Sequence, residues 1–128
     1  MSDQKADYIN YRLSKAHEAL RDAKLLAENN SWSTCINRLY YTCYYAASAL
    51  LLKNGVSTQT HNGSINQFNL HFIKTGKIRK ELGKLYANLM DWRQKGDYGD
   101  LFDFNRETVE PLLKPVEEFL NEITRLVE

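Results

Sequence analysis

The sequence predicts an all-α protein, an up-and-down four-helix bundle with an additional short helix, in a single domain over residues 1–128. Three observations lead to this prediction. Apolar residues recur at steps of three and four in four separate segments, which is the period of one helix face. The stretch from Ser31 to Asn54 is apolar or aromatic nearly all round, so a helix there needs neighbours on several sides. The chain holds only 6 Gly and 2 Pro, which argues against a fold of strands and turns. We therefore expect more than roughly 60% helix.

The first helix is expected over residues 3–30. Small alanines alternate with larger residues along its apolar stripe, which suits close packing against a partner helix. Asn29, Asn30 and Ser31 end it, and Ser31 or Ser33 can cap the next helix. So short a connection predicts that the first two helices form an antiparallel hairpin. The stripe consists of Ala6, Ile9, Leu13, Ala16, Leu20, Ala23 and Ala27.

The central helix is expected over residues 31–54, and its one interior charge is Arg38. An unpaired buried cation is very costly, so Arg38 must be paired or lie at a wet edge of the bundle. Asn54 and Gly55 provide a good left-handed terminus for this helix.

A shorter third helix is expected from about His61 to Lys74. Its apolar residues are Ile65, Phe68, Leu70 or Phe72, and Ile73.

The fourth helix is expected to end at Gly96 or Gly99, and residues 97–107 form a connector without periodicity. In the last helix, Pro115 either produces a kink or marks the true beginning. The apolar stripe of the fourth helix is Ile78, Leu82, Leu85, Leu89 and Trp92. The apolar stripe of the last helix is Val109, Leu112, Val116, Leu120, Ile123 and Val127.

The composition excludes several classes of function. The net charge is +1, so the chain has no overall charge signature of a nucleic-acid or membrane-binding protein. The charges are uneven, however, with a net +5 over residues 31–100 and a net −4 over residues 101–128, so an anionic ligand should prefer the middle of the chain. No apolar run reaches transmembrane length, and the N-terminus is polar. We therefore expect a cytoplasmic protein.

The two cysteines, Cys35 and Cys43, are eight residues apart on one expected helix. Their Cα atoms would lie roughly 12 Å apart, too far for a disulfide. The histidines and cysteines match no zinc spacing, so we expect neither a metal site nor a cofactor.

Three polar motifs stand out. The first is Asn37-Arg38-Leu39-Tyr40-Tyr41 in the central helix. Arg38 either forms a buried ion pair with a carboxylate such as Asp91 or Asp97, or holds a phosphate at a cleft. In the second case Asn37 and Tyr41 add polar contacts, because Tyr41 shares the helix face of Arg38.

The second motif lies at the end of the fourth helix, where Arg93, Asp97 and Tyr98 are close together in the sequence. Arg93 can serve as a C-terminal helix cation paired with Asp97. The third motif is Thr60-His61-Asn62-Gly63, in which His61 is either a capping or surface residue or part of a site.

In this order the motifs read NRxYY, H-x-G-x-x-x-x-F and R-x-x-x-D-Y, and the chain resembles the HEPN superfamily over roughly residues 5–127. The resemblance implies a helical bundle that forms a homodimer. Many members are metal-independent ribonucleases, often toxins encoded beside a nucleotidyltransferase-fold antitoxin. Their R-x(4–6)-H motif stabilises charge with the arginine and moves protons with the histidine during attack of a 2′-OH on the adjacent phosphate.

The chain departs from this motif. The allowed positions after Arg93 hold Tyr98, Gly99 and Asp100, and those after Arg38 hold Cys43, Tyr44 and Tyr45. The pair Arg12 and His17 has the literal spacing, but both lie inside the first helix, where their side chains would diverge.

The sequence therefore leaves three functions open. The first is a binding protein in a toxin–antitoxin-like pair, with a nucleotide or RNA phosphate held by Asn37, Arg38, Tyr41, Arg93, Asp97 and Tyr98 and a nucleotidyltransferase-fold protein as partner. The second is an active endoribonuclease toxin that uses Arg93 with Tyr98 or His61. The third is a purely structural helical dimer.

Overall fold

The computed structural model describes the backbone of residues 3–98 and 104–128, and the side chains of residues 4–95 and 104–128. Helices make up 84% of the described residues, and none of these residues lies in a strand, which confirms the all-α class. The elements are α1 (Asp3–Glu28), α2 (Trp32–Lys53), α3 (His61–Phe68), the π-helix η1 (Asn69–Ile73), α4 (Lys80–Tyr98) and α5 (Arg106–Val127).

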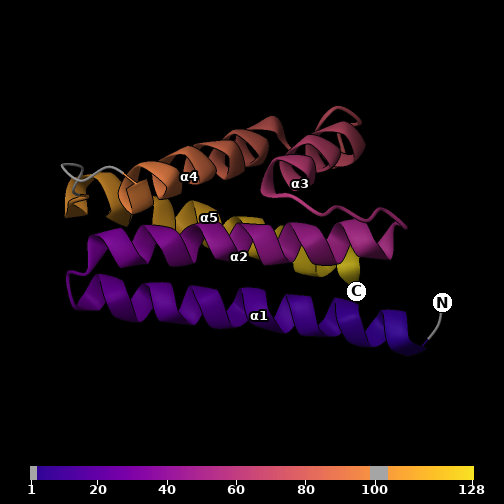
Figure 1. Cartoon of the computed structure of the whole chain (residues 1–128), viewed down its shortest axis with the longest axis horizontal. Helices are drawn as coiled ribbons and strands as arrows, with labels where there is room; N and C mark the ends of the chain where they lie inside the picture. Colours follow the sequence, from indigo (N-terminus) through magenta and orange to yellow (C-terminus); the bar gives the residue numbers. More distant parts are fainter. Residues whose placement is uncertain (1–2, 99–103) are drawn as a thin grey trace.

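The helix α2 is the centre of the bundle (Figure 1). It runs antiparallel to α1, as expected for the hairpin, and also antiparallel to α4, while α5 lies behind it and runs in the same direction. Because α2 contacts α1, α3, α4 and α5, its side chains are covered from several sides. Leu39, Tyr40 and Cys43 are completely buried.

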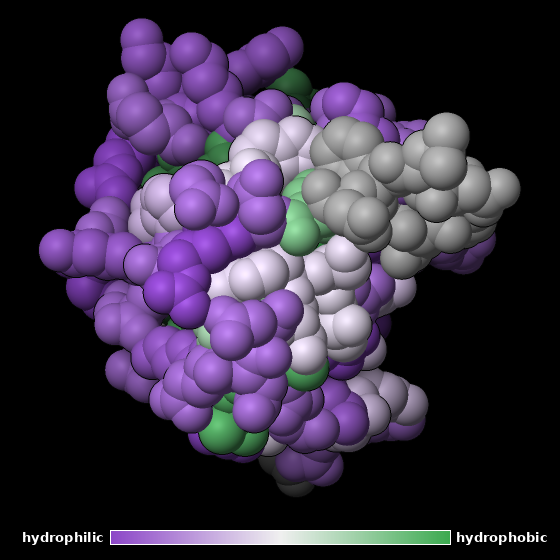
Figure 2. Space-filling model, turned by 90° about the vertical axis from the view of Figure 1, so that its left-hand side faces the viewer, coloured by the Kyte–Doolittle hydropathy of each residue, from purple (hydrophilic) through white to green (hydrophobic). Residues whose placement is uncertain are grey.

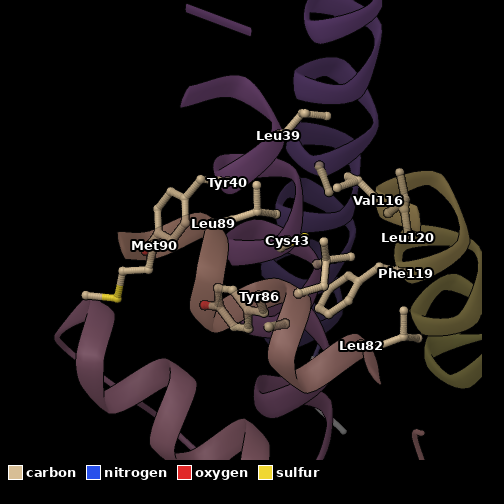
Figure 3. Close-up of a cluster of buried hydrophobic side chains, with 14 of the residues drawn as sticks. Leu39, Tyr40, Cys43, Leu82, Tyr86, Leu89, Met90, Val116, Phe119 and Leu120 are labelled. Carbon is tan, nitrogen blue, oxygen red and sulfur yellow. The ribbon is translucent and has the colours of Figure 1, made fainter. Parts of the chain in front are cut away.

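The core forms where α2, α4 and α5 meet (Figure 3). Cys43 of α2, Tyr86 and Leu89 of α4, and Phe119 of α5 point into the same apolar cluster, and each is completely buried. Burial of an apolar side chain of this size stabilises the fold by about 1.5–3 kcal/mol. This packing fixes the position of α4 against α2.

The ends of α2 differ from each other. Ser31 occupies the N-cap position, but its side chain makes no capping hydrogen bond, so the expected serine cap is wrong. At the other end, Gly55 has a φ of 77°, and the Gly55 and Val56 amides donate to the carbonyls of Leu52 and Leu51. These two hydrogen bonds form a Schellman motif and confirm the expected left-handed terminus.

The third helix departs most from expectation. It begins at His61, but beyond Phe68 the chain widens into the π-helix η1, so a single α-helix to Lys74 is wrong. Phe72 is buried, whereas the side chain of Leu70 is 48% exposed.

The beginnings of α4 and α5 show where Ile78 and the two prolines lie relative to these helices. Ile78 is buried but precedes α4, which begins at Lys80. Both Pro111 and Pro115 lie inside α5, so Pro115 does not mark its beginning. Asn105 caps this helix by accepting a hydrogen bond from the Thr108 amide.

One end of the molecule, where α1 turns into α2 and α5 begins, carries a mixed surface. Figure 2 shows pale and green atoms of intermediate and high hydropathy at its centre, within a largely purple, hydrophilic rim. None of the described helices combines the length and the apolar character needed to cross a membrane.

Candidate functional site

Arg38 lies at the partly exposed edge of α2 and is positioned by neutral groups. Its Nε and Nη2 atoms donate to the side-chain oxygen of Asn37, at 3.1 and 2.8 Å, and its guanidinium lies 5.0 Å from the ring centre of Tyr41. Neither of these two partners carries a charge, so among the described side chains the positive charge of Arg38 is held in place without being cancelled. Such a cation can attract an anion.

The expected ion pair between Arg38 and Asp91 is not found. Asp91 is exposed, and across the described side chains Arg38 makes no ion pair with any carboxylate. Asp97 and Tyr98 lie in the last turn of α4, and their side chains fall outside the described part of the structure.

Arg93 reaches the same place from α4. Because α4 runs antiparallel to α2, its C-terminal part lies beside the N-terminal part of α2. The Arg93 guanidinium lies 4.8 Å from the ring centre of Tyr40 and 5.8 Å from that of Tyr41. Arg38 and Arg93 therefore both contact the ring of Tyr41.

His61 is brought into this cluster by the N-terminus of α3. The Thr60 side chain accepts a hydrogen bond from the Gly63 amide at 2.8 Å and caps the helix that begins with His61. The His61 ring centre lies 4.6 Å from that of Tyr44, and its Nδ1 atom is hydrogen-bonded to the Tyr40 hydroxyl. His61 is thus a member of the site and not only the first residue of a helix.

The surroundings of His61 and Tyr40 shift the pKa values of both side chains and so determine their protonation states. Burial lowers the pKa of His61, and the nearby positive charge of Arg93 lowers it further. Burial raises the pKa of Tyr40, an effect that Arg93 opposes without overcoming. At neutral pH the imidazole is therefore uncharged and the phenol keeps its proton.

The direction of the hydrogen bond between Tyr40 and His61 follows from the acceptors within reach of the Tyr40 hydroxyl. His61 Nδ1 is the acceptor that lies within reach of the Tyr40 hydroxyl among the described atoms. If Tyr40 donates to Nδ1, its buried proton is satisfied, and the imidazole proton lies on Nε2. His61 then presents an N–H donor on its other side, as do both arginines.

The sequence-based site omitted Tyr40, Tyr44 and Tyr45. Tyr40 and Tyr44 are four residues apart on α2, a spacing that is typical of residues that pack on one helix face. Tyr40 is indeed completely buried, yet its hydroxyl orients His61. The available signal was chemical: a buried tyrosine hydroxyl usually needs a hydrogen-bond partner, and an uncharged histidine such as His61 can accept one.

The pair Arg12 and His17 does not form a site. The Arg12 side chain donates to the Ser48 carbonyl of α2, whereas His17 lies against Thr124 of α5. The two side chains diverge toward different helices, as the helical geometry predicts. The described residues also contain no group of three His, Cys, Asp or Glu side chains that could hold a metal ion.

Comparison with known proteins identifies the family. The family model of the HEPN domain matches residues 9–126. The chain belongs to the HEPN family. This confirms the resemblance drawn from the three motifs, and it places Arg38, His61 and Arg93 within the matched segment.

Several known proteins are similar to most of the chain. A protein of Thermotoga maritima named "UPF0332 protein" is 43% identical over 98% of this chain and 96% of its own length. Two proteins of Methanocaldococcus jannaschii bear names that read "Putative toxin". One, MJ0605, is 30% identical over 88% of this chain and 84% of its own length. The other, MJ0142, is 29% identical over 85% of this chain and 74% of its own length.

Proposed function

We propose that this HEPN protein binds the phosphate of a nucleotide or RNA at the cluster of Arg38, Tyr40, Tyr41, His61 and Arg93. The observation that carries the proposal is the pair of guanidinium groups on one ring, 5.0 and 5.8 Å from the centre of Tyr41. Two positive charges against one ring create a local positive potential that attracts an anion. A phosphate suits the site because arginine binds its oxygens with two parallel N–H donors.

The direction of the Tyr40–His61 hydrogen bond favours binding over catalysis. An imidazole with its proton on Nε2 can donate to a phosphate oxygen but has no free lone pair on that nitrogen for proton abstraction. Arg38, Arg93 and His61 together supply hydrogen-bond donors, which suits recognition of an anion. Asn37 keeps Arg38 in place in this proposal, and Asp97 and Tyr98 remain candidates at the end of α4.

The cellular role, the partner and the oligomeric state that we propose rest on the family and the named relatives. Relatives named as toxins support a toxin-like role, and the partner we propose is a nucleotidyltransferase-fold protein encoded nearby. We also propose a symmetric homodimer, as the resemblance to the HEPN superfamily implies. Light scattering that gives a monomer mass at micromolar concentration would contradict the dimer.

One observation favours the alternative of an endoribonuclease. His61 does not occupy the usual position of the motif histidine, yet it is brought together with Arg93 around Tyr40 and Tyr41. If the tautomer reverses when RNA binds, Nε2 becomes a general base for the 2′-OH. Cleavage of RNA in the presence of EDTA, lost in His61→Gln but retained in His71→Gln, would establish this activity.

The binding proposal is tested by thermal unfolding of wild type and Arg38→Ala, each with and without RNA. Arg38 has neutral partners, so its loss should cost about 1 kcal/mol or less. RNA should raise the melting temperature of wild type and leave that of the variant unchanged. A loss of about 3 kcal/mol in Arg38→Ala, with no effect of RNA on wild type, would instead assign Arg38 a structural role and support the purely structural dimer.

A further inference from the structure

Three tyrosines of α2 form a surface next to the two arginines, called here the tyrosine ledge: Tyr41, Tyr44 and Tyr45. Each is only partly buried. Their ring centres are 6.0 Å apart for Tyr41 and Tyr44, 6.0 Å for Tyr41 and Tyr45, and 5.5 Å for Tyr44 and Tyr45. Because each ring packs against the other two, the ledge is ordered before any ligand arrives, and binding to it costs little side-chain entropy.

The three rings differ in what already covers them. Arg38 and Arg93 lie over Tyr41, and His61 lies against Tyr44, which is also stacked on Tyr40 at 6.1 Å. Tyr45 is contacted by the rings of Tyr41 and Tyr44, and within the described side chains no cation lies over it. Tyr45 is therefore the ring of the ledge that can best accept a further flat group.

A positive charge beside partly exposed aromatic rings matches the two parts of a nucleotide. Proteins that bind single strands combine cations along the backbone with aromatic side chains on which the bases stack. In this site the cations are at Tyr41, and Tyr45, over which no cation lies among the described side chains, is one helical turn away at 6.0 Å. That step is within the reach of one nucleotide, whose phosphate and base are joined through a single ribose.

We propose that the tyrosine ledge stacks an unpaired nucleobase on Tyr45 while Arg38 and Arg93 hold the adjoining phosphate. This inference rests on the proposed function and specifies its ligand: single-stranded RNA, in preference to a duplex or an isolated phosphate group. In a duplex both faces of each internal base are covered by neighbouring bases, so no face is left for the ledge.

The test is fluorescence anisotropy of a labelled, unstructured oligoribonucleotide, with an abasic ribose-phosphate strand of equal length and an RNA duplex as comparison ligands. Wild type should bind the unpaired RNA most tightly. Tyr45→Leu should weaken that binding roughly tenfold and leave binding of the abasic strand unchanged. Tyr45→Phe should retain the wild-type affinity, because stacking needs the ring and not the hydroxyl. Tyr8→Leu is the matched control, since Tyr8 is a 53% exposed tyrosine on α1.

The outcomes separate the ledge from the phosphate site. If wild type binds the abasic strand or the duplex as tightly as the unpaired RNA, the ledge does not stack a base, although phosphate binding stands. If none of the three ligands binds, the proposed function itself is wrong. If Tyr45→Leu changes the oligomeric mass in light scattering and leaves the RNA affinity unchanged, the ledge is covered by a second copy, and the base-stacking proposal is overturned.

Discussion

The hydroxyl oxygen of Tyr40 lies 2.5 Å from Nδ1 of His61, linking the buried centre of α2 to the first residue of α3. Tyr40 is completely buried, and His61 is only partly so. The hydrogen bond therefore joins the core to the surface at the point where both arginines lie. It also decides which nitrogen of His61 faces outward as a donor.

The first prediction concerns the tautomer of His61. In wild type near neutral pH, nitrogen chemical shifts of the imidazole should report the proton on Nε2, because the Tyr40 hydroxyl occupies Nδ1. Tyr40→Phe removes that donor, so the Nδ1–H form should become populated, and stability should fall by about 1 kcal/mol. Identical imidazole shifts in the two proteins would show that Tyr40 does not orient His61.

The second prediction concerns pH. The pKa of His61 is lower in the folded than in the unfolded protein. Between the two values the unfolded state binds more protons, so the free energy of unfolding should decrease as the pH falls below about 6.5. Urea unfolding of wild type and His61→Gln between neutral pH and pH ~5 checks this, because the variant should show a smaller decrease. Parallel curves would contradict the pKa assignment.

The third prediction concerns the cap that places His61. A Cβ atom at Gly63 would lie 2.8 Å from the Thr60 side-chain oxygen, which is the acceptor of the capping hydrogen bond. Gly63→Ala should therefore displace this oxygen and cost about 1 kcal/mol in thermal unfolding. It should also weaken the contact between His61 and Tyr44, visible as altered imidazole resonances. Unchanged stability and resonances would mean that Thr60 moves aside freely.

The fourth prediction concerns the cysteines. Both are buried and free, and burial raises the pKa of the Cys35 thiol to about 11 and that of Cys43 well above its usual value. Since the thiolate is the reactive form, neither should react with a thiol reagent at pH ~8 in the native protein. Both should react promptly in denaturant. Rapid labelling of the native protein would contradict the described packing of α2.

Much of the fold could be predicted because its helices carry strong patterns. The stripe of α1 and the all-round apolar character of α2 both correspond to packing in the structure. The π-helix η1 could not be predicted, since its register depends on tertiary contact: Asn69 and Ile73 lie against Gly83 of α4. No local pattern in residues 69–73 encodes that neighbour.

The arginines and Tyr41 of the candidate site were recognisable in the sequence, but Tyr40, Tyr44 and Tyr45 were not. Arg38 and Arg93 were recognisable as polar exceptions on otherwise apolar helix faces. Tyr40 was not, because a completely buried tyrosine and a packing residue have the same sequence pattern. Its hydrogen bond to His61 spans 21 positions in sequence, and only the docking of α3 on α2 brings the two together.

The most direct test of phosphate binding is the salt dependence of RNA affinity in wild type, Arg38→Gln and the control Arg79→Gln. Arg79 is exposed and paired with Glu118, and it precedes α4, whereas Arg93 lies near the other end of that helix. Arg38→Gln should weaken binding across RNA sequences and reduce the slope of log affinity against log salt by about 0.7, the value for one phosphate contact on a single strand. Arg79→Gln should match wild type. If Arg38→Gln binds RNA with the affinity and slope of wild type, the arginine–tyrosine cluster does not hold the phosphate.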